Sequence, residues 1–377
     1  MAQQELKRGE IATQITNILK ENVDVGGLSV AVSSATTGSP FLFSAGHADI
    51  LRQEPMNNEH VFGIGSITKV FVAVVILQLI EEGKLSLTDT VGQHLSPAVY
   101  RGIDCAESAS VEQLLSHRAG IDSWEDELSW IVHGRGREMA PAHVWNREET
   151  LDYIRRPKMH APAPGNYDYS NTNYTLLGLI IDKVTRTTAE SQIRLRILQP
   201  LKMHHTFLEG FEECENERAP HRYHFATSEF RDTAGVCPAF SQVGDELIDV
   251  TQSNLSVEWA AGGLMSTTTD LLKFGRALKN GLMFSPASTA IMQSFRPTEP
   301  GVEMGCGLFR LSLQDKGTWL GHSGGVLGFS AGLWWKDDCV LCLLWNVGTM
   351  HTGTKTAVMR IIRETEFLPL VTELIQT

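Results

Sequence analysis

Short apolar segments with strand-like patterns stand in two groups, one near each end of the chain. Near the start, Leu28 to Ser33 and Phe41 to Ala45 flank a Gly-Ser-Pro turn at residues 38–40, which predicts a β-hairpin. Near the end, strand-like runs follow one another at residues 307–313, 319–321, 329–335 and 340–346. We expect the two groups to pair into one antiparallel sheet of five strands or slightly more.

The region between the two groups has helical periodicity instead. Its apolar positions recur at helical spacing in residues 66–82, 110–116, 147–154, 173–184, 190–197 and 269–280. An N-terminal helix that ends near Lys20 and a C-terminal helix over residues 355–366 are also predicted. The predicted fold is therefore α+β, with terminal helices flanking the sheet and a large, mostly helical domain inserted into it.

We place the sheet domain at residues 1–60 and 300–377, and the helical domain with its active-site loops at residues 61–299. The site is expected at the seam between them, where pockets often form. Residues 121–165 and 208–258 have weak periodicity and many Pro, Gly, Glu and His residues, which predicts loops or short elements that form binding walls. Of the tryptophans in the first segment, Trp124, Trp130 and Trp145, we take Trp124 as a candidate substrate contact.

Charge excludes two classes of partner. The chain of 377 residues has 32 Lys and Arg against 44 Asp and Glu, a formal net charge of -12. Its average field therefore repels nucleic-acid phosphates and anionic membrane surfaces. We expect a small-molecule ester or amide substrate, no nucleic-acid partner and no membrane partner, and the oligomeric state stays open.

The apolar runs and the cysteines bear on localisation. The first 19 residues contain no continuous apolar core of a secretory signal. The longest apolar run, Val70 to Ile80, is about half of the ~20 residues that a membrane span needs. Six cysteines are scattered along the chain, which favours free thiols in a reducing compartment. The sequence therefore predicts a cytoplasmic protein.

The strongest candidate for chemistry is the segment from Gly63 to Lys69, Gly-Ile-Gly-Ser-Ile-Thr-Lys, which runs into that apolar stretch. Gly65 and Ser66 are typical of a helix start, and Gly83 of its end. Residues three apart share one face of a helix, so the Ser66 hydroxyl and the Lys69 amine can meet. A lysine beside an apolar helix core loses solvation, which favours its neutral form and makes it a usable base. The alternative is that Ser66 only caps the helix and Lys69 is a solvated cation.

Two further motifs are Tyr169-Ser170-Asn171, which precedes a helical run, and Gly321-His322-Ser323-Gly324-Gly325 near the end. A tyrosine can act as an acid or base when nearby cations stabilise its phenolate, whereas Tyr169 taken alone is a packing aromatic and Asn171 a helix cap. The last motif also matches Gly-x-Ser-x-Gly, the nucleophile elbow of α/β-hydrolases. That elbow needs a helix after it, but residues 326–335 predict a turn and a strand.

Together the three motifs resemble those of the class C serine β-lactamases and the related DD-peptidases, D-aminopeptidases, esterases and transesterases, a penicillin-binding-protein-like family. Ser66-x-x-Lys69, Tyr169-x-Asn171 and His322-x-Gly324 follow in the family's order. Further stretches agree at residues 111–121 (VEQLLSHRAGI), 169–184 (YSNTNYTLLGLIIDKV) and 259–281 (WAAGGLMSTTTDLLKFGRALKNG). The resemblance covers about residues 25–350.

The resemblance implies a role for each matching residue. Ser66 corresponds to the nucleophile, Lys69 to its activating amine and Tyr169 to the relay that carries a proton to the leaving group. Asn171 corresponds to the residue that orients the lysine and hydrogen-bonds the substrate. The backbone N–H groups of Ser66 and Gly325 would form the oxyanion hole. The remaining catalytic and substrate-binding candidates from the third motif are His322, Ser323 and Gly324.

One position departs from the β-lactamase pattern. The β-lactamases themselves usually carry Lys-Thr-Gly at the third motif, where this chain has His322-Ser323-Gly324. Histidine, with a free pKa near ~6.5, is mostly neutral at pH 7 and anchors a substrate carboxylate less well than lysine. The sequence therefore predicts a serine hydrolase that cleaves an ester or amide bond of a small molecule, D-configured peptide bonds included, through an acyl-enzyme on Ser66.

Three alternatives stay open. The first is an acyltransferase or transesterase that uses the same acyl-enzyme, and the second is a β-lactamase or DD-carboxypeptidase. The third is a catalytically silent binding protein on the same fold. No cofactor and no metal are expected in any of them.

Other cysteine and histidine patterns favour structural roles. Cys339 and Cys342 resemble a redox or zinc pair, but residues three apart in a strand point to opposite faces, which favours buried structural thiols. His117, at the end of a predicted helix, is also assigned a structural role. Four further residues are of types that bind zinc: Cys214, His221, His224 and Cys237. Their irregular spacing favours surface histidines over a zinc site.

Overall fold

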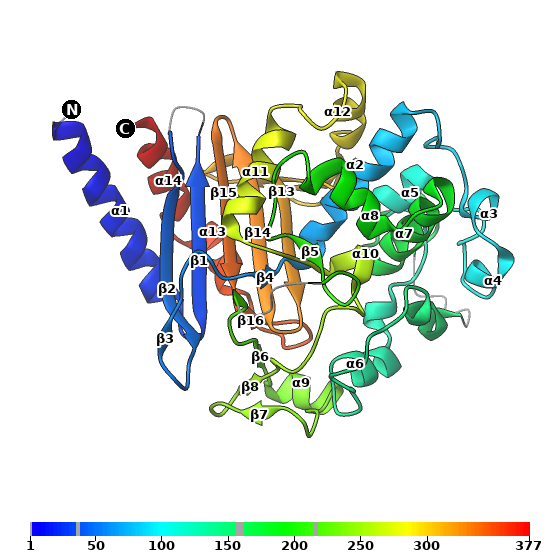
Figure 1. Ribbon diagram of the computed structural model, residues 1–377, viewed down its shortest axis with the longest axis horizontal. Helices are drawn as coiled ribbons and strands as arrows, with labels where there is room; N and C mark the ends of the chain where they lie inside the picture. Colours follow the sequence, from blue (N-terminus) through cyan, green and yellow to red (C-terminus); the bar gives the residue numbers. More distant parts are fainter. Residues whose placement is uncertain (1, 35–37, 156–161, 214–217) are drawn as a thin grey trace.

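The computed structural model describes residues 2–34, 38–155, 162–213 and 218–377. A large sheet stands between terminal helices on one side and a helical region on the other (Figure 1). In the described residues, nine strands form this antiparallel sheet in the order β10-β11-β12-β13-β14-β15-β1-β2-β3. Their bounds, in the same order, are Arg296–Glu299, Val302–Met304, Phe309–Leu313, Gly317–Val326, Phe329–Lys336, Cys339–Trp345, Gly27–Ser33, Phe41–Asp49 and Glu54–Pro55.

One pairing joins the two strand groups. β15 pairs with β1, with Trp345 opposite Leu28, so strands from both parts of the sequence share one sheet. The predicted α+β fold, with its antiparallel sheet and flanking terminal helices, is confirmed. The strands that the sequence did not predict, β10, β11 and β3, have only two to four residues each. The large sheet uses residues 27–55 and 296–345. The proposed domain boundaries, at residues 60 and 300, stay a prediction.

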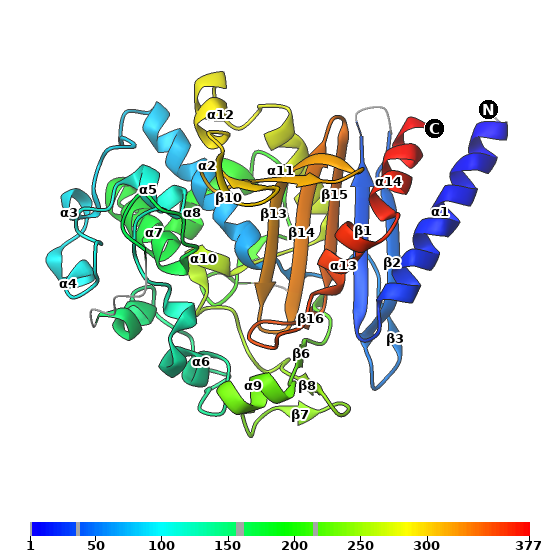
Figure 2. The same cartoon turned by 180° about the vertical axis from the view of Figure 1, so that it is seen from behind.

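Helices cover both faces of the sheet, which explains why its central strands are buried at successive positions. All seven residues of β1 and all seven of β15 are buried. Successive strand residues point to opposite faces, so Leu341 packs toward the terminal helices while Val340 faces the helical region. The terminal helices are α1 (Ala2–Asn22), α13 (Ala357–Glu364) and α14 (Phe367–Gln376), seen over the sheet in Figure 2.

The helical region is built around α2 (Thr68–Glu81), which is buried on nearly every side. Helices α7 (Asn171–Thr185), α8 (Ala189–Ile193), α10 (Trp259–Gly262) and α12 (Pro286–Met292) pack against it, and α11 (Thr268–Lys279) packs on β1, β14 and β15. The remaining helical segments are short: α3 (Val91–His94), α4 (Pro97–Tyr100), α5 (Val111–Leu115), η2 (Trp124–Asp126), α6 (Leu128–Gly134), η3 (Glu149–Ile154), η4 (Arg194–Leu198) and α9 (Ser228–Thr233).

The two weakly periodic segments contain only short elements in their described parts, as predicted. Two small sheets draw on them and on their surroundings. One has the order β16-β6-β8-β7 (Val347–Gly348, Tyr223–Phe225, Leu247–Asp249 and Ser241–Gln242), and the other β4-β9-β5 (Phe62–Gly63, Leu264–Ser266 and Phe207–Leu208).

The cysteine pair of β15 is structural, as predicted. Cys339 and Cys342 are both buried and belong to the cores on opposite faces of the sheet. Of the zinc candidates, Cys214 lies outside the described residues, and His221 Nδ1 lies 2.8 Å from Asp249 Oδ2. Within the described ranges, no group of side chains is arranged to hold a metal ion. No helix in that part of the chain is long and apolar enough to cross a bilayer.

Candidate active site

Ser66 and Lys69 stand at the start of the central helix. Ser66 belongs to the 3₁₀ turn η1 (Gly65–Ile67), and α2 follows directly. The Lys69 Nζ atom lies 2.9 Å from the Ser66 Oγ atom, as the spacing of three residues predicted. Ser66 is partly exposed, whereas the residues on either side of it are buried. A partly exposed serine therefore stands beside a buried amine.

The Lys69 side chain is fully buried, and three oxygen atoms surround its amine. Besides Ser66, these are Asn171 Oδ1 at 2.6 Å and the Ala261 carbonyl oxygen at 2.7 Å. Burial lowers the pKa of Lys69 to about 7, against the carboxylates of Glu125 and Glu258, which raise it. A neutral fraction at pH 7 lets this amine accept a proton.

A buried charge cluster, which the sequence did not predict, orients Asn171. The Asn171 Nδ2 donates to the Glu125 carboxylate, which leaves its Oδ1 facing Lys69. Arg135 pairs with the same carboxylate and, at 2.8 Å, with that of Glu258. Burial raises the pKa of Glu258. No sequence motif joins positions 125, 135 and 258, so only the folded chain shows that they act on one lysine.

Tyr169 lies close to Lys69 and is stacked on a buried histidine. The Lys69 Nζ atom is 5.0 Å from the centroid of the Tyr169 ring, and the His117 ring is stacked on Tyr169 at 4.1 Å. The Ser170 backbone N–H donates to His117 Nδ1 at 3.1 Å, which holds the backbone next to Tyr169. His117 thus positions the tyrosine from a fully buried site.

The Tyr169 hydroxyl is buried, although the residue as a whole is partly exposed. Burial raises the pKa of this phenol well above its usual value, and the neighbouring Ser66 hydroxyl opposes the shift. The hydroxyl accepts or donates no hydrogen bond of normal geometry within the described residues. Catalytic hydrogen bonds often tighten only when substrate binds, so a protonated phenol beside Ser66 can still serve as a proton donor.

The third motif lies on strand β13. His322 is only 2% exposed, its Nδ1 faces the Ser323 carbonyl oxygen, and its ring centroid is 4.8 Å from that of Phe309. Burial lowers the pKa of His322 to about 3, so the ring is neutral at pH 7. His322 therefore supplies no cation for a substrate carboxylate.

The backbone of Gly324 and Gly325 lies against the turn that carries Ser66. A Cβ atom placed on Gly324 would lie 1.9 Å from the Ile64 carbonyl oxygen and 3.1 Å from the Ser66 nitrogen. A Cβ atom on Gly65, whose φ is +53°, would lie 2.6 Å from the Gly325 nitrogen. The backbone of β13 therefore packs directly against the Ser66 turn, and a side chain on Gly65 or Gly324 would force the two apart.

We expect Gly324→Ala to lower kcat by about 100-fold, because the methyl group must push β13 away from Ser66 and a shift of ~1 Å can cost that much. Gly325→Ala is the matched control, since its Cβ would meet only the movable Met350 side chain, 2.9 Å from Sδ. The measurements are kcat on an activated ester and Tm. Equal kcat values for the two variants would contradict the prediction that close packing of β13 on the Ser66 turn is needed for catalysis.

The tryptophans of the first loop segment are core residues. Trp124 has no exposed surface, its Nε1 donates to Thr175 Oγ1 at 3.1 Å, and its ring packs on that of Trp130. Trp130 and Trp145 are buried as well. The expectation that Trp124 contacts substrate is therefore corrected, because its side chain is used to pack α6 and α7.

Ser323 is not placed as a nucleophile elbow would require. It lies inside β13, which continues to Val326, and strand β14 follows rather than a helix. Its side chain lines a cavity together with residues of β10, β12 and α13. The elbow interpretation is thereby excluded by the local fold.

The fold and the cluster around Ser66 define a serine hydrolase of the β-lactamase-related type. Comparison with known sequences agrees, since the family described as Beta-lactamase matches residues 15–352. The chain belongs to this family. The penicillin-binding-protein-like resemblance of its three motifs is thereby confirmed.

Two solved structures that resemble this chain are D-stereospecific amidases. D-amino acid amidase from Ochrobactrum anthropi SV3, in complex with D-phenylalanine, superimposes with a TM-score of 0.80 at 25% identity, over 97% of this chain and 99% of that one. The D-stereospecific amidohydrolase from Streptomyces sp. gives 0.77 at 25% identity, over 93% and 97%.

Two curated relatives are longer than the matched region. Protein flp of Staphylococcus aureus (strain MW2) is 30% identical over 199 residues, which are 51% of this chain and 37% of that protein. Penicillin-binding protein 4* of Bacillus subtilis (strain 168) is 25% identical over 305 residues, 78% of this chain and 63% of that protein. The chain thus spans less than two thirds of the length of either relative.

Proposed function

We propose that this protein cleaves an ester or amide bond of a small molecule through an acyl-enzyme on Ser66. The observation that carries the proposal is the distance of 2.9 Å between Lys69 Nζ and the hydroxyl of Ser66, a partly exposed residue. A lysine whose pKa burial lowers to about 7 can take the serine proton as Oγ attacks the carbonyl carbon. The C–O bond to Ser66 forms while the carbonyl oxygen becomes the oxyanion.

The other residues complete the proposed cycle. The N–H groups of Ser66 and Gly325 stabilise the oxyanion. Tyr169 gives its proton to the leaving alcohol or amine as that bond breaks, and recovers a proton from Lys69. Asn171 keeps the lysine amine in place. Water, with Lys69 again as base, then attacks the ester on Ser66 and releases the acid.

Two observations favour esters and amides over β-lactams as substrates. The neutral, buried His322 stands where the β-lactamases usually carry a lysine, so this position offers no fixed cation to a β-lactam carboxylate. The similar solved structures include a D-amino acid amidase and a D-stereospecific amidohydrolase. We therefore propose D-amino-acid amides, along with simple esters, as the first substrate class.

The enzymatic alternatives differ from this proposal in the acyl donor or in the acyl acceptor. An acyltransferase or transesterase would use the same residues and differ only in its acceptor, and a DD-carboxypeptidase or β-lactamase only in its acyl donor. A catalytically silent binding protein is less well supported, because the described structure keeps Ser66, Lys69 and Asn171 within hydrogen-bonding distance.

The proposal is tested by exposing the protein to a penicillin, a cephalosporin, simple esters and D-amino-acid amides, and measuring turnover and intact mass. We expect turnover of the esters and D-amino-acid amides to exceed that of both β-lactams. Rapid cephalosporin hydrolysis with negligible esterase activity would overturn the proposed substrate class. Adding amine or alcohol acceptors separates hydrolysis from acyl transfer, because only a transferase forms the new ester or amide.

A further inference from the structure

The buried charge cluster beside Lys69 is assembled from three separate segments. Glu125 lies in η2, Arg135 caps the C-terminal end of α6, and Glu258 directly precedes α10. Their exposed fractions are 9%, 1% and 4%, so all three side chains are withdrawn from water. Buried charges are costly unless they are paired, and each charge in this cluster therefore depends on the others.

One nitrogen of Arg135 holds both carboxylates. Its Nη2 donates to the Glu125 carboxylate and, at 2.8 Å, to Glu258 Oε1. Its Nε and Nη1 are buried and have no hydrogen-bond partner among the described residues. The central carbon of the guanidinium lies 5.1 Å from the centroid of the Trp130 ring, which supports the cation from one side. Arg135 thus acts as a single positive point between two acidic groups, a contact that a lysine ammonium can also make.

Both acidic residues are connected to the Lys69 amine. The Glu125 carboxylate accepts a hydrogen bond from Asn171, whose Oδ1 accepts one from Lys69 Nζ at 2.6 Å. The Glu258 carbonyl oxygen accepts from the Ala261 N–H at 2.8 Å, and the Ala261 carbonyl oxygen accepts from Lys69 Nζ at 2.7 Å. Burial lowers the pKa of Lys69, and the two carboxylates raise it. The charge balance of the cluster therefore bears directly on the protonation of the lysine.

The other ionisable groups around Lys69 are neutral near pH 7. They are two phenols, whose pKa values burial raises, and two imidazoles, whose pKa values burial lowers: Tyr169, Tyr174, His117 and His322. Three further groups face Glu125 or Arg135 and are unchanged in every variant below: Asp126, His224 and His351. Arg135 is therefore the cation that balances the two carboxylates whenever Lys69 is neutral.

We propose that Arg135 is a positioning residue of the reaction, which acts on Lys69 through the two carboxylates that its guanidinium holds. It fixes Glu125, which orients Asn171, and it offsets one of the two negative charges that face the lysine amine. Without Arg135, Lys69 is the one cation left between Glu125 and Glu258, and it keeps its proton. This inference rests on the proposed function, because it assigns a partner to the lysine base of that reaction.

The test is the pH dependence of kcat/KM on an activated ester and of the rate at which a fluorophosphonate labels Ser66. Both rates need a neutral Lys69, so each rises as the pH rises through the pKa of the lysine. Arg135→Met should move this acid limb to higher pH, because two unbalanced carboxylates raise the pKa of Lys69. Glu258→Gln should move it to lower pH, because one carboxylate fewer lowers that pKa. Each shift should be about one pH unit, the low end of the effect of a neighbouring charge.

Two further variants keep the test decisive even if Arg135→Met does not fold. The double variant Arg135→Met/Glu258→Gln loses one charge of each sign, so its acid limb should return to that of the unmodified protein. Arg135→Lys keeps the cation and should also leave the limb unmoved. A merely structural role of Arg135 predicts a lower Tm without shifts of opposite sign. A double variant whose limb stays where Glu258→Gln places it would show that Arg135 has no effect on Lys69.

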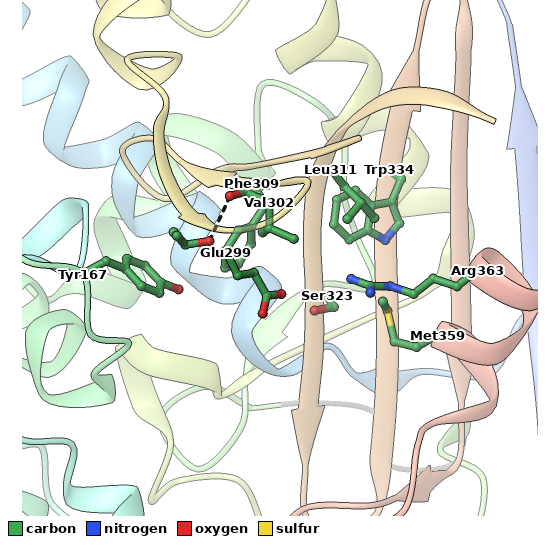
Figure 3. Close-up of a pocket in the computed structure, with 10 residues that line it drawn as sticks. Tyr167, Glu299, Val302, Phe309, Leu311, Ser323, Trp334, Met359 and Arg363 are labelled. Atoms are coloured by element: carbon green, nitrogen blue, oxygen red, sulfur yellow. Dashed lines mark hydrogen bonds between the residues drawn. The ribbon is translucent and has the colours of Figure 1, made fainter. Parts of the chain in front are cut away.

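Arg222→Met is the matched control, because Arg222 is another buried arginine, only 5% exposed, whose Nη1 donates to Glu209 Oε2 at 3.0 Å. It should leave the acid limb unmoved, whatever its effect on Tm. The described residues that line the cavity at Ser323, shown in Figure 3, include none of the substituted positions, so those walls are kept in every variant.

The outcomes separate this inference from the proposed function. Acid limbs of Arg135→Met and Glu258→Gln that do not move in opposite directions would overturn the inference, while labelling of Ser66 in the same proteins leaves the proposed function standing. An unmodified protein that is not labelled at any pH counts against the proposed function alone.

Discussion

Ser66→Ala is expected to lower kcat by about 10⁶-fold on both an ester and an amide, the loss typical when the nucleophile of a serine hydrolase is removed. Without Oγ there is no acceptor for the acyl group, and the remaining donors can only stabilise direct attack by water. The covalent fluorophosphonate adduct should disappear in the same variant. Both effects are measured on purified protein, the first by steady-state kinetics and the second by intact mass.

Ser323→Ala separates this assignment from the other serine of the third motif. Since Ser323 lies within β13 and faces the cavity, the variant should still form the adduct on Ser66. An adduct that maps to Ser323, or that persists in Ser66→Ala, would reverse the assignment of the nucleophile. The Tm of both variants shows whether the fold is kept.

The centre of the sheet was predictable because turns bound its strands, and β1 and β15 are buried along their whole length. β15 is apolar at every position and β1 carries Leu28, Val30, Ala31 and Val32, a pattern that differs from the helical periodicity of the region between them. Their mutual pairing follows from the need to bury both runs in one sheet. The sequence did not predict β10, because its residues are mostly exposed and polar, or β11, because three residues are too few to show an alternation.

The candidate site was predictable where its geometry is local. Ser66 and Lys69 meet because a helix brings residues three apart onto one face, whatever the rest of the chain does. The placing of Tyr169 and Asn171 beside them came only from the resemblance, since the Lys69 to Asn171 contact joins residues 102 positions apart. No local pattern encodes a contact of that range.

The buried charge cluster next to Lys69 could not be predicted from the sequence. Glu125, Arg135 and Glu258 come from three separate short elements, and each looks like an ordinary surface charge in its own segment. Trp124 shows the opposite error, because a loop rich in polar residues suggested a substrate wall while the side chain packs in the core. In both cases burial is decided by distant parts of the chain.

Tyr169→Phe is expected to lower kcat by about 10²- to 10⁴-fold, the usual cost of losing general acid-base help. The substitution keeps the ring that stacks on His117 and removes only the buried hydroxyl near Ser66. The loss should be larger for an amide than for an activated ester, because an amine leaving group needs a proton and an activated alkoxide or phenolate does not. The measurement is kcat for one amide and one activated ester of the same acyl group.

Lys69→Ala completes the experiment, because residues that act as one unit have non-additive effects. If Tyr169 and Lys69 pass one proton between Ser66 and the leaving group, removing either breaks the same path, and the double variant should lose much less than the product of the two single losses. Packing alone predicts a different pattern, since a phenylalanine ring fills the space of the tyrosine equally well for every substrate. Equal losses for ester and amide, together with fully multiplicative effects in the double variant, would show that Tyr169 shapes the site without carrying a proton.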